Sequence, residues 1–365
     1  MAVICPGSRT WTWDYRENGS NSSAGESDSD PNSRCQMGIE MRRNSFARCI
    51  ARLLAGLCGM AVGIAAAQSD WPKAKPVSIL VGFAPGSTTD IVARLVAQKL
   101  GETSGASFMV ENKPGAGGNI ASSLVKRSAS DGYTVLAHSV AFAVNPSLYP
   151  NAGYDAIRDF IPLAFGGRTP NIITVNPATP ARDLKELVEL ARRQPLNYAS
   201  SGIGTTTHLS IERLKTAAAV GITHVPYQPA AAIAAVVGNQ TQMASTSMPP
   251  AVPQIRAGKL HAIAVTSAKR SALLPDVPTV GESGYVDFDD YTWIGFFLPV
   301  GVPPALVERF NADINKAMEA PEVRERFAQA GLEIVRYTPA EFGAFLKAEV
   351  PKWAAVVKSS GAKVE

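Results

Sequence analysis

Short apolar runs alternate with amphipathic helical patterns along most of this chain, and that alternation most constrains its fold. The runs predicted as strands cover residues 77–81, 108–110, 134–137, 172–175, 197–200, 261–266 and 332–335. The segments predicted as helices cover residues 90–100, 183–193, 206–218, 303–320 and 339–359. Strands that alternate with helices of this length form parallel sheets flanked by helices. The sequence therefore predicts an α/β fold, and 365 residues with 46% hydrophobic side chains favour two lobes.

The N-terminus is typical of an export leader. A basic segment begins at Met41, an uncharged run of 14 residues covers 53–66, and Ala65-Ala66-Ala67 supplies an A-x-A cleavage site. We therefore predict a signal peptide over residues 41–67, cleavage near Gln68 and a periplasmic mature chain.

Other interpretations of this segment are a buried helix, a membrane anchor or a lipoprotein. A run of 14 residues is shorter than the ~18–20 residues that span a bilayer, and Leu57 stands where a lipidated Cys58 needs a small neighbour. Residues 1–40 are polar and show no apolar period, so we expect them to be a non-native or disordered extension, with translation starting at Met41 or Met37. No later run is long and uncharged enough to span a membrane.

Charge, aromatic content and cysteine placement argue against several functions. The formal net charge is only +4 and aromatic residues make up 7%, which argues against a nucleic-acid surface. All four cysteines precede residue 59, so the mature chain has neither disulfides nor thiol chemistry. The histidines show no metal-binding spacing, and no G-x-S-x-G motif stands in the sequence. We therefore predict no metal, no cofactor and no enzymatic activity.

The first chemically informative loop follows the predicted strand 77–81 and reads Gly82-Phe83-Ala84-Pro85-Gly86-Ser87-Thr88-Thr89-Asp90. Ser87 and Asp90 fit a capping box, which fixes the start of a helix there. A helix N-terminus presents unpaired N–H groups and the positive end of the helix dipole. Asp90 and Arg94 are also spaced as an ordinary ion pair on a helix surface.

The second loop, Tyr198-Ala199-Ser200-Ser201-Gly202-Ile203-Gly204-Thr205-Thr206-Thr207-His208, also follows a strand and opens a helix. Two such N-termini that face each other across a cleft would form an anion clamp, with Gly204 allowing the backbone to approach the ligand. Neither loop contains Lys or Arg, so backbone amides and hydroxyls would hold the anion. The simpler interpretation makes both loops ordinary well-capped turns, with His208 as a packing residue.

A third segment, Glu111-Asn112-Lys113-Pro114-Gly115-Ala116-Gly117-Gly118-Asn119-Ile120, is rich in glycine but lacks both nucleotide-binding glycine spacings. It is equally compatible with a cleft wall and with a tight turn. Trp293 and Trp353 are interpreted mainly as core residues.

All three segments resemble the Bug family, the receptors of tripartite tricarboxylate transporters. Further matches are His224-Val225-Pro226-Tyr227, Ala257-Gly258-Lys259-Leu260 and Leu274-Pro275-Asp276-Val277-Pro278-Thr279-Val280. The resemblance runs from about Trp71 to the C-terminus, in order and with natural spacing.

The resemblance implies a two-lobed periplasmic binding protein fold of the type II-like Venus flytrap class, with parallel-rich sheets flanked by helices. Lobe 1 would hold residues 68–168 and 293–365, lobe 2 would hold residues 169–292, and the chain would cross near 168–170 and 291–293. The two loops would grip a small carboxylate between the lobes, and closure would present it to membrane permease subunits. The expected ligand-binding residues are Phe83, Ala84, Gly86, Ser87, Thr88, Thr89, Asp90, His138, Ser200, Ser201, Gly204, Thr205, His208 and Tyr227.

Three departures from the family pattern bear on ligand choice. Ser87 stands where a second glycine is usual, and Gln228-Pro229 replaces the usual Lys-Gly, which removes a cation from the expected pocket edge. Ser245-Thr246-Ser247 stands where an acidic residue is common. Alternatives to an uptake receptor are a sensory receptor without its own permease, an exported α/β enzyme for an anionic substrate, and a cytoplasmic sensing domain.

Overall fold

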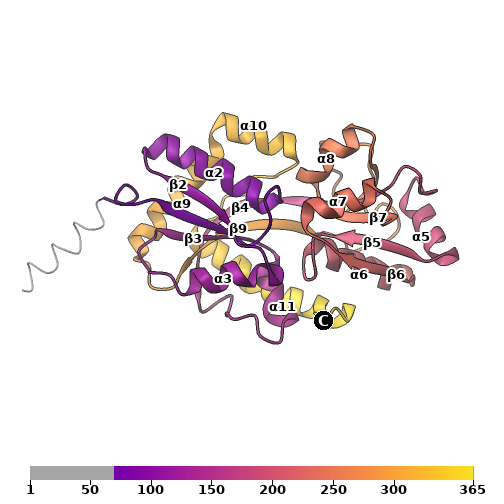
Figure 1. Ribbon diagram of the computed structural model, residues 1–365, viewed down its shortest axis with the longest axis horizontal. Helices are drawn as coiled ribbons and strands as arrows, with labels where there is room; N and C mark the ends of the chain where they lie inside the picture. Colours follow the sequence, from indigo (N-terminus) through magenta and orange to yellow (C-terminus); the bar gives the residue numbers. More distant parts are fainter. Residues whose placement is uncertain (1–69, 365) are drawn as a thin grey trace, which may run out of the picture. The chain divides into compact units, whose positions relative to one another are not determined.

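The computed structural model describes residues 70–364, and there it confirms the predicted alternation of strands and helices (Figure 1). The predicted signal peptide over 41–67 and the extension over 1–40 lie outside the described residues. Between residues 70 and 364, no helix combines the length and the apolar character needed to cross a membrane.

Three parallel strands form the first half of the sheet, with β1 (Val77–Val81) between β2 (Phe108–Asn112) and β3 (Thr134–Ser139). Successive side chains of a strand point to opposite faces, so Ile79 and Leu80 enter different hydrophobic cores. The helices of the Ile79 core are α2 (Thr88–Ser104), α9 (Pro304–Glu319) and α10 (Pro321–Ala330). Those of the Leu80 core are α3 (Asn119–Lys126), α4 (Ala141–Leu148) and α11 (Pro339–Ser360). Figure 1 shows α2 and α3 on opposite sides of these strands.

The second half repeats this arrangement, with β5 (Leu196–Ser200) parallel to both β6 (Ile222–Pro226) and β7 (Met243–Ser247). Tyr198 and Ala199, neighbours on β5, again enter different cores. The helices that pack there are α5 (Leu184–Arg193) and α6 (Thr206–Ala218) on one face, and α7 (Pro229–Val237) and α8 (Met248–Arg256) on the other.

Two long strands connect the halves. Strand β4 (Phe160–Val175) pairs antiparallel with β9 (Tyr291–Pro299) as far as Pro170, and from Asn171 onward it pairs antiparallel with β7 and β8 (His261–Val265). The nine-stranded sheet is therefore mixed, with the predicted parallel pairing confined to each half. Strand β4 changes partner between Pro170 and Asn171, where the chain was expected to cross between the lobes. The assignment of residues to lobes stays a prediction.

Proline and polar residues account for most of the elements that the sequence did not predict. Helices α4, α7, α8 and α10 all contain or begin with proline, which is tolerated in a first turn but breaks the periodic pattern. Strand β7 reads Met-Ala-Ser-Thr-Ser and lacks an apolar run. The predicted strand 332–335 is wrong, because only Glu333 pairs, in one isolated bridge with Arg168 beside an irregularity of β4.

Candidate functional site

Four helices begin at one place in the structure, where parallel strands end. The residues that cap α2, α6, α7 and α8 are Ser87, Thr205, Gln228 and Ser247. They follow strands β1, β5, β6 and β7, respectively. Because β5, β6 and β7 are parallel, their carboxyl ends lie at one edge of the sheet and α6, α7 and α8 begin together. The first turn of α2 lines the same cavity as the first turn of α6. Helix N-termini from both halves of the sheet therefore converge, and their unpaired N–H groups favour an anion.

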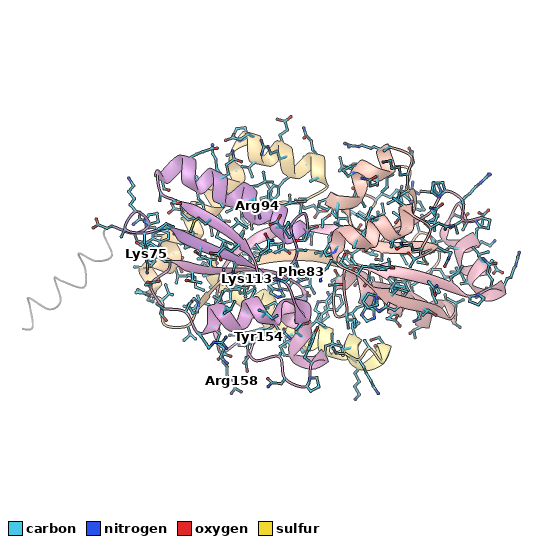
Figure 2. The ribbon with its side chains drawn as sticks, in the orientation of Figure 1. Lys75, Phe83, Arg94, Lys113, Tyr154 and Arg158 are labelled. Atoms are coloured by element: carbon cyan, nitrogen blue, oxygen red, sulfur yellow. The ribbon has the colours of Figure 1, made fainter. Side chains whose placement is uncertain are left out.

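Two adjoining cavities lie between these N-termini. The inner cavity measures about 30 Å³ and is lined by Phe83, Ser87, Thr88, Thr89, Ser139, Ser201, Thr205, Thr206, Thr207, Pro229, Ser247 and Thr292. The outer cavity measures about 380 Å³ and is lined by Gly82, Phe83, Gly115, Ala116, Gly117, Gly118, Tyr149, Ser201, Gly202, Ile203, Thr205, Pro226, Tyr227 and Gln228. Phe83, Ser201 and Thr205 line both, so the two cavities lie side by side, and Figure 2 shows Phe83 between the two halves of the sheet.

Two hydroxyl pairs lie around the inner cavity, and the pair of Thr88 with Ser247 joins the two halves. Thr88 Oγ1 lies 2.6 Å from Ser247 Oγ, and Thr206 Oγ1 lies 2.5 Å from Thr292 Oγ1. By contrast, no hydrogen bond among residues 70–364 engages the hydroxyl of Thr89 or of Ser201. These two hydroxyls, one from each predicted loop, are therefore free to donate to a ligand.

The first loop is held by Asp90. Ser87 Oγ accepts the Asp90 N–H at 3.2 Å, as the capping box predicts, whereas the Asp90 carboxylate reaches back to Gly86 N at 2.9 Å. The same carboxylate accepts hydrogen bonds from Arg94 Nε and from Asn112 Nδ2. Burial alone would raise the pKa of Asp90, but these hydrogen bonds and the Arg94 charge outweigh it and hold the pKa below its usual value. Asp90 thus shapes the loop and lines neither cavity.

The second loop is supported by a stack of rings. His208 Nδ1 accepts the Gly204 N–H at 3.3 Å, and its ring stacks on His224 with centroids 4.1 Å apart. Ser200 Oγ lies 2.7 Å from His224 Nε2. Burial lowers the pKa of His208 to about 4 and, with repulsion from His208, that of His224 to about 3. The interpretation of His208 as a packing residue agrees with this geometry.

Gly204 itself faces protein. A Cβ built on Gly204 would overlap the side chain of Leu148 on α4, and the residue has φ +78°, a left-handed conformation that favours glycine. The expected role of Gly204, close approach of backbone to ligand, is therefore corrected: it allows α6 to approach α4.

His138 is fully buried beneath the glycine segments. Cβ atoms built on Gly82 and Gly118 would meet its ring, and Phe83 packs edge-on against it at 5.3 Å. His138 Nδ1 accepts the Ser139 N–H at 2.9 Å, and burial lowers the pKa of the ring to about 4. His138 lines neither cavity and supports the residues that do.

The depressed pKa of His138 predicts a loss of stability in mild acid. In the unfolded state His138 takes up a proton below a pKa of about 6.5, whereas in the folded state it does so only near pH 4. The neutral ring therefore makes its full contribution to the free energy of unfolding above pH 6.5, and that contribution is lost as the pH falls from 6.5 to 4. The contribution of His138 is about 3 kcal/mol. Denaturant unfolding at pH 7 and pH 4 checks this, and His138→Gln should reduce the difference. A variant with the full wild-type difference would contradict the prediction.

The glycine segment proves to be both a turn and a wall. Residues Ala116–Gly118 form a single 3₁₀ turn, and Gly115 through Gly118 line the outer cavity with backbone. The two interpretations left open by the sequence therefore describe the same structure.

The structure brings seven of the expected ligand-binding residues to the cavities: Phe83, Ser87, Thr88, Thr89, Ser201, Thr205 and Tyr227. Those that line neither cavity are Ala84, Gly86, Asp90, His138, Ser200, Gly204 and His208. Lining residues that were not expected include Ser139, Tyr149, Thr206, Thr207, Gln228, Ser247 and Thr292. Gln228 and Ser247 stand in segments that depart from the family pattern. That departure was the sequence signal that could have marked them as lining residues. Trp293 is buried and donates its indole N–H to Glu349, as expected of a core residue.

No group of three or more metal-ligating side chains that could hold a metal ion occurs within residues 70–364. Charged side chains are also missing from both cavity linings. The site can therefore offer hydroxyl groups, backbone N–H groups, helix N-termini and aromatic faces.

Comparison with known proteins gives a family match over most of the chain. The model of the tripartite tricarboxylate transporter family receptor, TctC, matches residues 92–362. The protein BugT of Bordetella pertussis is 34% identical over 326 residues, which cover 87% of this chain and 99% of BugT.

Solved structures of the same kind share the fold. The periplasmic binding protein BugD is 35% identical with a TM-score of 0.76, covering 80% of this chain and 99% of BugD. Rpa4515 of R. palustris, solved with adipate, is 32% identical with a TM-score of 0.78, covering 81% of this chain and all of that protein. These matches confirm the resemblance found in the sequence and the predicted fold class.

Proposed function

Since this chain belongs to the tripartite tricarboxylate transporter receptor family, we propose that it is an extracytoplasmic receptor that binds a small carboxylate between the two halves of its sheet. The observation that carries the proposal is that Thr89 and Thr205, from loops more than a hundred residues apart, line one cavity. The adipate bound to Rpa4515 supports a carboxylate as the ligand class.

The donors around the cavity suit a carboxylate. Thr89 and Ser201 offer unengaged hydroxyls, and α2 and α6 present their N-termini beside them. Charge-assisted hydrogen bonds contribute about 1.5–3 kcal/mol each, so four or five support micromolar binding, which needs about 8 kcal/mol.

Ligand binding would favour a closed arrangement of the two halves. The hydroxyl pair Thr88–Ser247 requires the halves to be close. Strand β4 passes from β9 to β7 and β8 between Pro170 and Asn171, opposite the start of β9 at Tyr291, where a hinge would act. A ligand that contacts both loops binds the closed state more tightly and shifts the population toward it. The closed receptor would then deliver its ligand to membrane permease subunits, or signal to a sensor partner in a cell that lacks them.

A catalytic role is disfavoured by the environment of Ser200–His224, the one pair of a serine hydroxyl and a histidine ring among the described hydrogen bonds. Ser200 is fully buried and lines neither cavity, and a histidine with a pKa of about 3 is a weak base at neutral pH. We therefore propose a receptor that releases its ligand unchanged.

Calorimetric titration with adipate, malate, hexanoate and benzoate tests the proposal. At least one of these carboxylates should bind with micromolar affinity and be recovered chemically unchanged after incubation. Turnover of a bound acid would favour an enzyme, and binding of none would contradict the receptor. Cell fractionation with N-terminal sequencing checks export, since the mature chain should start near Gln68.

A further inference from the structure

Asn112, the last residue of β2, joins the two ends of the first loop although it lines neither cavity. Its Nδ2 lies 2.9 Å from the carbonyl oxygen of Phe83, near the start of the loop, and 2.8 Å from Asp90 Oδ1, in the first turn of α2. Its Oδ1 accepts a hydrogen bond from Arg94 Nη2 at 2.8 Å. One side chain from a different strand therefore holds both Phe83 and the start of α2.

The amide of Asn112 makes three contacts that a carboxylate of the same shape cannot make. Nδ2 donates to two oxygen acceptors and Oδ1 faces a guanidinium, so these partners fix the orientation of the amide. A carboxylate in its place would donate to neither Phe83 nor Asp90 and would add a negative charge beside Asp90. Arg94 Nε also donates to Asp90 Oδ1, which closes the network.

The two ends that Asn112 joins carry different parts of the site. Phe83 lines both cavities and presents an aromatic ring there, whereas Thr88 and Thr89, in the first turn of α2, line the inner cavity. The distance between the ring and the anion donors of α2 therefore depends on how residues 83–90 are held. A binding site keeps its geometry when side chains outside it lock the contacting residues in place.

We propose that Asn112 is a positioning residue, which sets the distance between the Phe83 ring and the anion donors of α2 and thereby the length of ligand that the receptor prefers. The inference rests on the proposed function and adds a determinant of selectivity to the same site. Loss of Asn112 should change the preference among ligands, in addition to any uniform loss of affinity.

Three aromatic acids measure this preference by calorimetry: benzoate, phenylacetate and 3-phenylpropionate. Each carries one ring and one carboxylate, and each successive member separates the two by one more methylene. A site of fixed geometry distinguishes ligands that differ by one methylene about tenfold or more. We expect the wild type to favour one length by about tenfold, and Asn112→Asp to reduce that ratio to less than about threefold.

Asn176→Asp is the matched control. Asn176 also donates two hydrogen bonds, to the carbonyl oxygens of Val236 and Val237, and accepts one from the N–H of Ala178. It follows β4 in the other half of the sheet and lines neither cavity. Thermal unfolding should show that Asn176→Asp is destabilised, while its ratio among the three acids stays that of the wild type.

Arg94→Gln tests the same network at a half-exposed side chain, and it decides the question if Asn112→Asp does not fold. It removes the donor to Asn112 Oδ1 and should reduce the ratio by about two- to threefold. A variant that binds all three acids more weakly by one common factor would show a merely structural role and overturn the inference. A wild type that binds none of the three, or all three equally, would also overturn it, while binding of hexanoate, adipate or malate would leave the proposed function intact.

Discussion

The double variant Thr89→Val/Ser201→Ala is expected to bind its carboxylate at least about 100-fold more weakly than the wild type, because it removes two hydroxyl donors to an anion. Both hydroxyls lie at the cavities and make no hydrogen bond within the described residues. Their loss should therefore leave the folded protein almost as stable as before. Calorimetric titration measures the affinity, and thermal unfolding without ligand measures the stability.

A conservative control lies at the other end of the same helix. Thr103 bonds only to backbone carbonyls in the last turn of α2, so Thr103→Val should leave the affinity unchanged. If Thr89→Val and Ser201→Ala each keep wild-type affinity, the carboxylate does not lie between these loops.

Gly118→Ala is expected to destabilise the protein by about 2–5 kcal/mol. Gly118 has φ +94°, where an L side chain is strained, and its Cβ would overlap the Nε2 of His138. The imidazole has little room to move, because Phe83 and Phe142 pack against it at 5.3 and 5.7 Å. Denaturant unfolding of the purified variant measures the change in the free energy of unfolding.

Two further variants separate backbone strain from the collision. Gly105 has φ +68° and open space around its Cβ position, so Gly105→Ala should cost only the strain, about 1–2 kcal/mol. Adding His138→Ala to Gly118→Ala should relieve the collision, giving a favourable coupling energy of about 1–3 kcal/mol. Additive effects of Gly118→Ala and His138→Ala would show that the two residues do not meet.

The sequence predicted the parts of the site that local rules determine. Ser87 with Asp90, and Thr205 at the start of α6, are capping signals that need only a few neighbouring residues. The strand 77–81 was located correctly from a short apolar run, and the helix predicted over 183–193 lies within one residue of α5 because apolar periodicity there is strong.

Residues that join the site through tertiary packing escaped prediction. Thr292 lies in β9, and Ser139 ends β3, where nothing local marks either as a lining residue. Conversely, His138 and Gly204 stand close in sequence to lining residues, but they pack against Gly118 and Leu148, respectively, and line neither cavity. Which side of a loop faces the cavity depends on contacts between distant segments, and sequence spacing does not contain that information.

The most direct test of the account is a crystal structure of the protein with bound benzoate. We predict that the carboxylate lies within hydrogen-bond distance of Thr89 Oγ1 and Ser201 Oγ, with the ring beside Phe83 and no Lys or Arg in contact. A benzoate held by a cationic side chain, or bound away from the cavity that Thr89 and Thr205 share, would contradict it.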